Sequence, residues 1–319
     1  MRSTKGQNHP STAVLLLGFN RIDLFSKRLN QLSRNAQIPI FVSIDGSDIA
    51  TQNLFSLLMK EFISGNPEMK ISFKVHEKNL GLAKHLTTAI SEVLNEFDQI
   101  IVIEDDIILS ENFIANMLNG LYLAKNANNI GVVGGFSAFS SRNSKFKRPK
   151  WRKSSNFPAW GWGITRECWS HYQLELPPNY LEALNHSRAW QSQSSYKKKV
   201  WTARFTKVAN DNPFTWDYQM QYLLFRRDMM TLLPTNRISD NEGFDSVSSS
   251  NTKDKRPRWM GEERVFDGML QGKISRVSRL YQVRDALTYG GDIRVVHIFS
   301  ILRKIRGSLR RKRLKGPTD

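Results

Sequence analysis

The sequence lacks the features that mark a secreted or membrane-spanning protein. Cys168 is the single cysteine among 319 residues, which excludes an internal disulfide and a zinc site built from several cysteines. No apolar run approaches the roughly 20 residues of a transmembrane helix. The run 13–19 follows Arg2 and Lys5, but it is short and lacks a small-residue cleavage site, so it predicts a first strand and not a signal peptide. A cytoplasmic location is therefore the expectation.

Acidic residues are outnumbered by basic ones. The chain has 47 lysines and arginines against 29 aspartates and glutamates, a formal net charge of +18. Such an excess suits nucleic acid, anionic lipid or phosphorylated substrates. The basic residues gather at 145–153, at 197–199 and near the C-terminal end. No zinc finger, RNA-recognition motif or similar module accompanies them, so nucleic acid is not the predicted partner.

Apolar runs alternate with helical stripes in the first half of the chain. Strands are predicted at 13–18, 38–44, 71–75, 99–103 and 130–133, and helices at 22–34, 49–63, 80–97 and 111–125. This alternation predicts a doubly wound, mostly parallel α/β sheet. Such a sheet brings the carboxyl ends of its strands to one edge, where ligands bind.

The alternation is lost after about residue 136. The stretches 137–156 and 239–261 are rich in polar and charged residues, and we expect loops there. Helices are predicted at 165–172 and from the segment 214–219 to about 227, with a strand or extended segment at 232–237. The second half is therefore expected to be more irregular than the first.

Three adjacent acids, Glu104, Asp105 and Asp106, follow the apolar run 100–103. The run predicts a buried parallel strand. Carboxylates at its end would repel one another in a core, so we expect them to face a cleft. Their oxygens suit Mg²⁺ or Mn²⁺; Mg²⁺ takes one or two protein carboxylates and fills its other positions with water and phosphate oxygens. The alternative is an acidic element end before a helix capped by Ser110.

Other polar residues also follow predicted strands. Asn20 and Arg21 follow the first strand, and Asp45 follows the second. In a parallel sheet they would gather with the acids along one edge. Asp45 also precedes Gly46, so turn formation explains it equally well.

Several short motifs occur in a recognisable order along the chain. They are Phe19-Asn20-Arg21, Val42-Ser43-Ile44-Asp45-Gly46, Ala83-Lys84-His85, Glu104-Asp105-Asp106, and Trp160-Gly161-Trp162-Gly163 followed at a distance by Trp216-Asp217. In this order they resemble the nucleotide-sugar transferases of the glycosyltransferase A fold, most closely the branch typified by N-acetylglucosaminyltransferase I. The resemblance covers roughly residues 13–247.

The resemblance implies a role for each motif. It implies donor contacts for Asn20, Arg21, Asp45, Lys84, His85, Glu104 and Asp105, a divalent cation (Mn²⁺ or Mg²⁺) on Asp106, and sugar or acceptor contacts for Trp160, Trp162 and Trp216. Asp217 would be the base that deprotonates an acceptor hydroxyl. A bound cation can neutralise the charge on a departing nucleoside diphosphate. One displacement with a single base inverts the anomeric centre, so an inverting, metal-dependent glycosyltransferase is the predicted function.

These assignments have structural alternatives. Large rings such as those of Trp160 and Trp162 are usually buried in the protein core. A lone histidine such as His85 on a helix face is often buried and hydrogen-bonded. Asp217 can equally cap the helix that it begins.

Apolar residues of the C-terminal tail recur at helical spacing. Val295, Ile298, Phe299, Leu302 and Ile305 form one stripe flanked by arginines and lysines, which predicts a basic amphipathic helix on an anionic membrane surface. The alternative is a helix packed on the core. A transferase on the cytoplasmic face of an inner membrane would suit glycan or lipid-linked acceptors, as in bacterial lipopolysaccharide or capsule assembly.

The chain is thus expected to have four parts. They are a disordered segment 1–11, a nucleotide-sugar-binding half 12–135, an acceptor and catalytic half 136–290 of the same domain, and the tail 291–319.

Two other functions remain as alternatives. A nucleotidyltransferase would need a glycine-rich phosphate-binding loop after the first strand, and the stretch 18–21 is poor in glycine. A basic nucleic-acid- or membrane-binding protein on a non-catalytic α/β scaffold would bind nucleic acid in a salt-sensitive way and have no affinity for nucleotide sugars.

Overall fold

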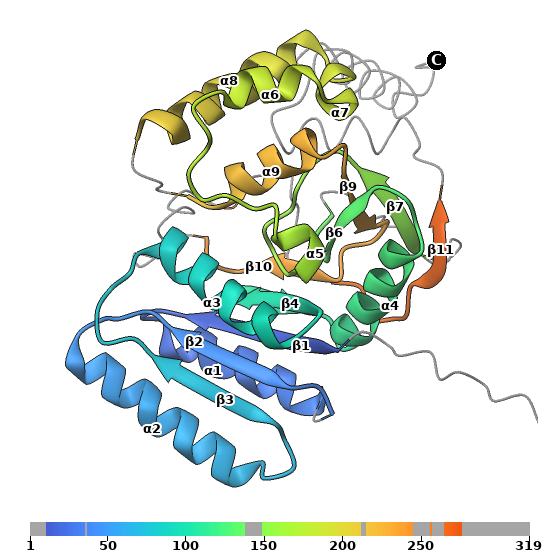
Figure 1. Cartoon of the computed structure of the whole chain (residues 1–319). Helices are drawn as coiled ribbons and strands as arrows, with labels where there is room; N and C mark the ends of the chain where they lie inside the picture. The colour runs from blue at the N-terminus through green and yellow to red at the C-terminus, as the bar shows by residue number, and fades with distance from the viewer. Residues whose placement is uncertain are drawn as a thin grey trace, which may run out of the picture.

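The computed structural model describes residues 11–35, 37–137, 149–211, 215–244, 256 and 265–275. Within them, a nine-stranded sheet runs through both halves of the chain in the order β11-β7-β9-β6-β8-β4-β1-β2-β3 (Figure 1). Residues 1–10 and the tail 291–319 lie outside the described residues. The disordered N-terminus and the tail helix therefore stay predictions.

The first half alternates strands and helices as predicted. The strands are β1 (Thr12–Gly18), β2 (Ile40–Ile44), β3 (Ile71–Val75) and β4 (Gln99–Glu104), and the helices are α1 (Ile22–Leu32), α2 (Ile49–Gly65), α3 (Leu82–Glu96) and α4 (Phe113–Lys125). Their ends lie no more than two residues from the predicted ones.

The strand order of the sheet changes direction between β1 and β4, because β2 and β3 extend the sheet on one side of β1 and β4 lies on its other side. β1 pairs in parallel with β2 on one side and with β4 on the other, and β2 pairs in parallel with β3. In open α/β sheets, ligands bind outside the carboxyl ends of the strands at such a reversal. Arg21 and the three acids follow these two strands.

The second half extends the same sheet. Its strands are β6 (Ile130–Gly134), β7 (Lys150–Ser154), β8 (Trp162–Thr165), β9 (Met230–Pro234) and β11 (Gln271–Ser275). β8 runs antiparallel between β4 and β6, and β7 runs antiparallel to β9. The pairs β6 with β9 and β11 with β7 are parallel. The prediction of a mostly parallel α/β sheet is confirmed.

The predicted loop at 137–156 is wrong in its last part, which contains β7. Trp151 and Arg152 on this strand have no exposed surface. The Trp151 ring packs against Gly120 of α4, where an added Cβ would lie 2.9 Å from the ring. Its Nε1 donates to Asn119 Oδ1 at 3.2 Å. Contacts with a distant helix, and not the basic composition, decide this local structure.

The predicted loop at 239–261 begins with a strand. β10 (Ser239–Asn241) is buried at all three residues and pairs antiparallel with β5 (Ile107–Leu109), which directly follows the acids. Residues 245–255 and 257–264 lie outside the described residues, so the rest of the loop stays a prediction.

Several helices accompany the second half of the sheet, most of them in the upper part of Figure 1. They are α5 (Arg166–Trp169), α6 (Tyr180–Asn185), α7 (Arg188–Gln191), α8 (Ser195–Asn210) and α9 (Asp217–Arg226). Sequence analysis predicted α5 and α9 but none of the three between them. α6 to α9 share an apolar cluster made of Leu184, Trp190, Trp201, Phe205, Tyr222 and Phe225.

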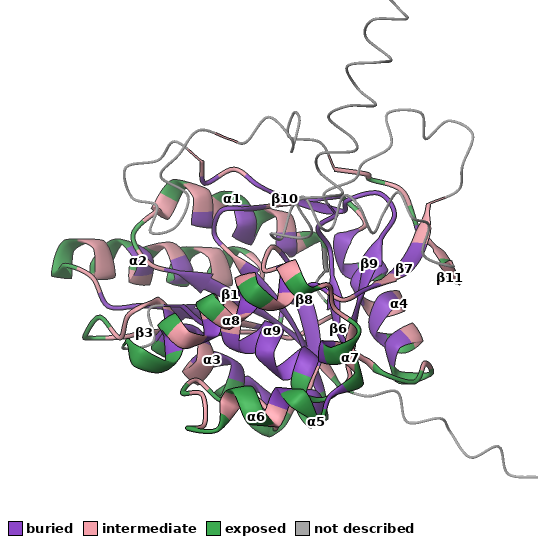
Figure 2. Cartoon of the chain, turned by 90° about the horizontal axis from the view of Figure 1, so that it is seen from above, coloured by how far each residue is buried: buried purple, intermediate pink, exposed green. Residues whose placement is uncertain are grey.

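Apolar clusters fill both faces of the sheet. Residues of α1, α2 and α4 pack on one face, and residues of α3, α5 and α9 pack on the other. The inner strands between them are buried (Figure 2), whereas the edge strands β3 and β11 are partly exposed. α9 therefore contacts the sheet on one side and the aromatic cluster of α6 to α8 on the other. Across the described ranges, no helix is long and apolar enough to cross a membrane.

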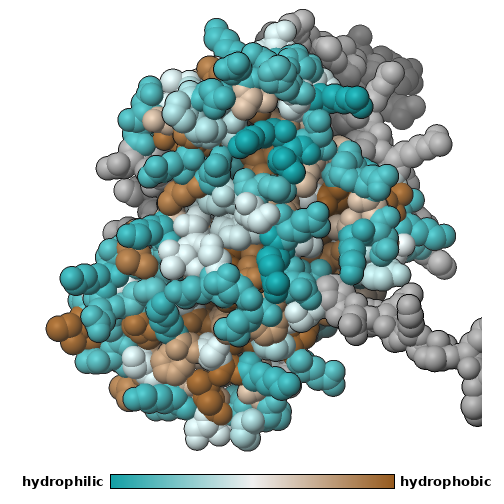
Figure 3. Space-filling view, in the orientation of Figure 1, coloured by the Kyte–Doolittle hydropathy of each residue, from teal (hydrophilic) through white to brown (hydrophobic). Residues whose placement is uncertain are grey.

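The surface shown in Figure 3 is largely hydrophilic, with apolar side chains interspersed. The most exposed of the large apolar side chains include three on α2, namely Ile49, Leu54 and Leu57, which are 76%, 54% and 57% exposed. Scattered apolar side chains of this kind are ordinary on a protein surface.

Candidate active site

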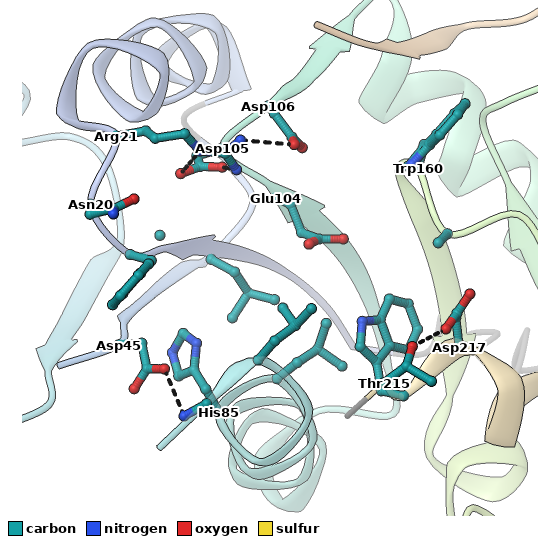
Figure 4. Close-up of a pocket in the computed structure, with 18 of the residues that line it drawn as sticks. Asn20, Arg21, Asp45, His85, Glu104, Asp105, Asp106, Trp160, Thr215 and Asp217 are labelled. Carbon is teal, nitrogen blue, oxygen red and sulfur yellow. Dashed lines mark hydrogen bonds and ion pairs between the residues drawn. The ribbon is translucent and has the colours of Figure 1, made fainter. Parts of the chain in front are cut away.

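A pocket of about 470 Å³ opens where β1 and β4 end (Figure 4). Its lining joins the turn after β1, the residue after β2, the start of α3, the acids after β4, and two segments of the second half at 159–160 and 215–217. The volume is in the range of small-molecule sites. The pocket lies at the reversal of strand order, as the sequence predicts for a ligand site.

Arg21, which precedes α1, is ion-paired with two of the three acids. Its Nε donates to Asp105 Oδ2 at 3.2 Å and its Nη2 donates to Asp105 Oδ1. Its Nη1 donates to Asp106 Oδ2 at 3.1 Å. Burial lowers the pKa of Arg21, but the two carboxylates outweigh that effect and hold this pKa above its ordinary value. Arg21 is therefore a permanent cation beside the acids.

Glu104 is the acid that Arg21 does not bond. Within the described part of the chain, neither Glu104 nor Asp106 Oδ1 has a side-chain hydrogen-bond partner. Burial, and then repulsion from Asp106 and Asp105, raises the pKa of Glu104 well above its ordinary value. Burial also raises the pKa of Asp105 to about 6, against the attraction of Arg21. Three carboxylates beside one guanidinium leave an excess of negative charge, which protons or a bound cation can relieve.

These residues fit a hard divalent cation. The Glu104 carboxylate and Asp106 Oδ1 offer the pocket oxygens that no protein donor occupies in the described ranges, whereas Asp106 Oδ2 accepts from Arg21. Gly243 lies against Asp106, where an added Cβ would be 2.4 Å from Oδ2. Among the described residues, no three His, Cys, Asp or Glu side chains are arranged to hold an ion. A cation here would take one or two carboxylates and fill its other positions with water and phosphate oxygens, as Mg²⁺ does.

The pair of strands β5 and β10 holds Asp106 in place. Glu242, directly after β10, donates from its backbone N to Asp106 O at 2.9 Å. Its carboxylate is ion-paired with the buried Arg28 of α1, which also donates to Ile107 O at 3.0 Å. The metal-binding candidate is therefore supported by a segment more than a hundred positions away in the sequence.

Asp45 lines the pocket, but backbone groups occupy its oxygens. Oδ1 accepts from Gly46 N at 2.9 Å and from Leu80 N at 2.8 Å. Oδ2 accepts from Gly81 N at 3.1 Å. These bonds join the end of β2 to the start of α3, so the turn alternative accounts for them. A donor contact by Asp45 stays a prediction.

His85 lines the pocket from α3 and is 4% exposed. Its Nε2 lies 2.8 Å from Ser43 Oγ, and Nε2 of His76 lies 3.3 Å from the same oxygen. Burial lowers the pKa of His85 to about 4, although Asp45 raises it in part. His85 is therefore neutral at pH 7 and can contact a nucleotide through a hydrogen bond but not as a cation.

The three predicted tryptophans lie in different surroundings. Trp160 forms part of the pocket wall beside the rings of Phe136 and Phe244, with centroids 4.5 and 6.0 Å away. Trp162 on β8 has no exposed surface, so its ring cannot stack on a sugar, and the structure places it in the core. Trp216 borders the pocket, is 3% exposed and stacks on Trp162 at 5.3 Å.

Asp217 is the first residue of α9 and lies across the pocket from Arg21 (Figure 4). Its Oδ1 accepts from Thr215 Oγ1. Burial raises the pKa of Asp217, and the Thr215 hydrogen bond opposes this effect. The N-cap of α9 is Trp216, and no side chain makes a cap hydrogen bond there, so the alternative that Asp217 caps the helix is wrong, although the helix dipole favours an acid in the first turn.

The structure thus brings most of the predicted site residues to one pocket. Those that line it are Asn20, Arg21, Asp45, His85, Glu104, Asp105, Asp106, Trp160, Trp216 and Asp217. Lys84 does not: it is exposed on α3 and outside the lining, because neighbouring helical positions face different ways. Trp162 is the other exception.

Sequence analysis missed five polar or glycine positions of the lining. They are Gly18, Asn79, Gly81, Thr215 and Asn241. Gly81 has a φ of +78° and Asn79 Oδ1 accepts from its N at 2.7 Å, a turn signal that was available in the sequence. Asn241 reaches the pocket only through the pairing of β10 with β5, for which the sequence has no local signal.

No family model and no curated protein matches this sequence. Among solved structures, it is similar to the mannosyltransferase PcManGT from Pyrobaculum calidifontis in complex with GDP-Man and Mn²⁺, with 13% identity over 70% of this chain and 87% of that chain and a TM-score of 0.42. It is also similar to the glycosyltransferase GlyE of Streptococcus pneumoniae, with 13% identity over 68% and 63% of the chains and a TM-score of 0.32.

A third similar structure is 4-diphosphocytidyl-2C-methyl-D-erythritolsynthase from Anaerococcus prevotii, with 10% identity over 70% of this chain and 86% of that chain and a TM-score of 0.35. TM-scores below 0.5 are too low to support a functional argument. The proposals below therefore depend on the residues of this chain, and the N-acetylglucosaminyltransferase I branch stays a prediction.

Proposed function

We propose that this chain is a metal-dependent, inverting glycosyltransferase of the glycosyltransferase A type. It would move a sugar from a nucleoside-diphosphate donor to a hydroxyl of a glycan or lipid-linked acceptor. The observation that carries this proposal is one pocket with two kinds of acid. Glu104, Asp105 and Asp106 form a cluster with excess negative charge on one side, and Asp217 stands alone on the other.

The acid cluster would bind the donor. Asp106, with Glu104 beside it, would hold Mn²⁺ or Mg²⁺, which neutralises charge on the diphosphate when it is bound. Arg21 is a cation at the same place and would bind phosphate oxygens or keep Asp105 ionised. Asn20 and the neutral imidazole of His85 line the nucleotide side of the pocket and would contact the nucleoside.

Asp217 would be the general base. A base must lie within hydrogen-bond reach of the hydroxyl that it deprotonates, and its pKa works best when burial brings it toward the operating pH. Asp217 borders the pocket, and burial raises its pKa. A single base with direct displacement inverts the anomeric centre. Trp160, half-buried at the wall, would stack on the acceptor or the transferred sugar.

The wider setting is also a proposal. An acceptor on a bacterial surface polysaccharide, and attachment to an anionic membrane through the tail 291–319, would explain the +18 charge.

A donor screen tests the proposal. Purified protein is incubated with Mn²⁺ or Mg²⁺ and a panel of UDP-, GDP- and dTDP-sugars, and binding is scored by thermal shift and by slow donor hydrolysis. We expect one nucleotide class to respond only with metal, and Asp106→Asn to lose that response at least tenfold because a carboxylate ligand is removed. The matched control is Asp23→Asn, an exposed acid in the first turn of α1, which should behave like wild type.

Two outcomes contradict the proposal. If no nucleotide sugar binds to the folded protein, the acids are structural and the pocket has another ligand. If a donor binds equally well without metal and in Asp106→Asn, the cation assignment is wrong while a transferase remains possible. The anomeric configuration of the product, read by NMR, decides separately whether the transfer inverts.

A further inference from the structure

Each residue of the turn 215–217 accepts a hydrogen bond from a side chain. Thr215 Oγ1 donates to Asp217 Oδ1. Gln219, which is 1% exposed, donates from Nε2 to Thr215 O at 2.8 Å. The hydroxyl of Tyr172 donates to Trp216 O at 3.2 Å. The Thr215 hydroxyl is therefore held at a defined position beside the carboxylate.

Thr215 itself is 5% exposed and borders the pocket. Bulk water therefore does not compete for its hydroxyl as it would on a surface. A hydroxyl that donates to a carboxylate favours the ionised form, because the protonated acid is a poorer acceptor. In a buried place this preference is stronger than in water.

The charged and titratable groups that face Asp217 come from several elements. Arg204 on α8 favours its ionised form, and Glu104 after β4 repels it. Burial, and to a smaller extent Asp217, raises the pKa values of Tyr172 and Tyr218, so neither is ionised near neutral pH. The hydrogen bonds of Thr215 and of the helix backbone, and then Arg204, oppose the effect of burial on this carboxylate.

We propose that Thr215 is a positioning residue, which fixes the Asp217 carboxylate in the orientation and the ionised state that proton acceptance requires. The inference rests on the proposed function, in which Asp217 is the base. With Oδ1 bonded to the Thr215 hydroxyl, Oδ2 is the oxygen that receives the proton from the acceptor. Thr215 does not touch the reacting atoms; it acts through Asp217.

The test is the pH dependence of kcat/KM in Thr215→Val and Thr215→Ser. Valine keeps the shape of threonine but lacks the hydroxyl that donates the hydrogen bond, and serine keeps that hydroxyl. The base works only when deprotonated, so losing a hydrogen bond that favours the carboxylate raises its pKa. The acid limb of the profile should then move to higher pH by about one pH unit, a roughly tenfold loss of activity on that limb. Thr215→Ser should keep the wild-type profile.

Two further measurements keep the result interpretable. The pKa of the Asp217 carboxyl is followed by ¹³C NMR in labelled protein, which needs no activity and should rise in Thr215→Val. Donor affinity should be unchanged, because the acid cluster lies on the other side of the pocket. If Thr215→Val does not fold, Thr215→Ala removes the same donor and leaves a small void in place of a methyl group.

The positioning role would be overturned if the pH profile of Thr215→Val overlays that of wild type. It would also be overturned if Thr215→Ser shows the same shift as Thr215→Val. Failure of the proposed function looks different. If Asp217→Asn retains full transferase activity, Asp217 is not the base, and the role of Thr215 falls with it.

Discussion

The two sides of the pocket hold their acids in different ways. On one side, three successive carboxylates at the end of β4 lie beside one guanidinium, which bonds Asp105 and Asp106, and the Glu104 carboxylate has no hydrogen-bond partner within the described residues. On the other, Asp217 stands alone at the start of α9 and is bonded by the neutral hydroxyl of Thr215. The first arrangement has excess charge and suits a cation; the second has one carboxylate with a neutral partner and suits proton transfer.

The difference has a physical origin. A guanidinium that bonds a carboxylate strongly also makes it a poor base, because the ion pair must be weakened when the acid is protonated. A hydroxyl imposes a smaller penalty. The same residue type can therefore bind a cation on one side of a pocket and accept a proton on the other, as its partners decide.

The largest expected effect is the loss of activity when Asp217 is replaced. Asp217→Asn removes the one acid that the described residues place on its side of the pocket, so kcat should fall roughly 10²- to 10⁴-fold, while metal-dependent donor binding remains. The matched control is Asp211→Asn, an exposed acid after α8, which should retain full activity. Steady-state kinetics with a donor binding titration checks both variants. Loss of donor binding in Asp217→Asn would mean that the two sides do not act separately.

The second prediction concerns the Arg21 guanidinium, which is paired with the acid cluster. Arg21→Met leaves Asp105 and Asp106 buried without their partner, which should lower the free energy of unfolding at pH 7 by about 3 kcal/mol. The Arg21 side chain is 18% exposed, so solvent screens the pair only in part. The loss should be smaller at pH 5, because Asp105 has a pKa raised to about 6 and takes up a proton there. Added Mn²⁺ should restore part of the stability.

Urea unfolding at both pH values measures this effect. The control is Arg34→Met, which makes the same charge change at a pair with Glu111 whose side chains are both 70% exposed and 3.8 Å apart. It should cost less than about 0.5 kcal/mol. Equal losses in the two variants would show that Arg21 contributes only to the general charge balance.

The third and smallest effect concerns His85 on the donor side. Its pKa is lowered to about 4 in the folded protein from an ordinary 6.5, so the folded state binds its proton less readily than the unfolded state. The stability that this contributes is fully present above pH 6.5 and is lost as the pH falls toward about 4. His85→Gln should remove that loss, which is on the order of 2 kcal/mol.

The pKa shift of Asp105 changes the stability with pH in the opposite direction, so its contribution must be separated from that of His85. Its raised pKa stabilises the protein below about pH 4, and that contribution is lost as the pH rises through about 6. The difference between wild type and His85→Gln across pH 4 to 7, measured by thermal unfolding, cancels the Asp105 contribution. A difference that does not change with pH would contradict the prediction for His85.

Much of the first half could be predicted from the sequence, because its structure follows from local patterns. The run 100–103 is apolar at every position, and a strand with no polar side chain must be buried on both faces. The polar residues after such strands then share one edge. Trp162 shows the limit of this reasoning, since a Trp-Gly motif does not say which ring faces the core; pairing of β8 with β4 and β6 decides that.

Residue type and short-range order are enough to specify the alternation of strands and helices, the place of the three acids at the end of β4 and the excess of basic residues. The tertiary structure set the remaining features. It placed Arg21 on Asp105 and Asp106, brought β10 beside β5, and set the segment 215–217 across the pocket from the acid cluster. These contacts join segments through the packing of distant elements, and side-chain charge, burial and partners, which set the chemistry of an acid, exist only once that packing is complete.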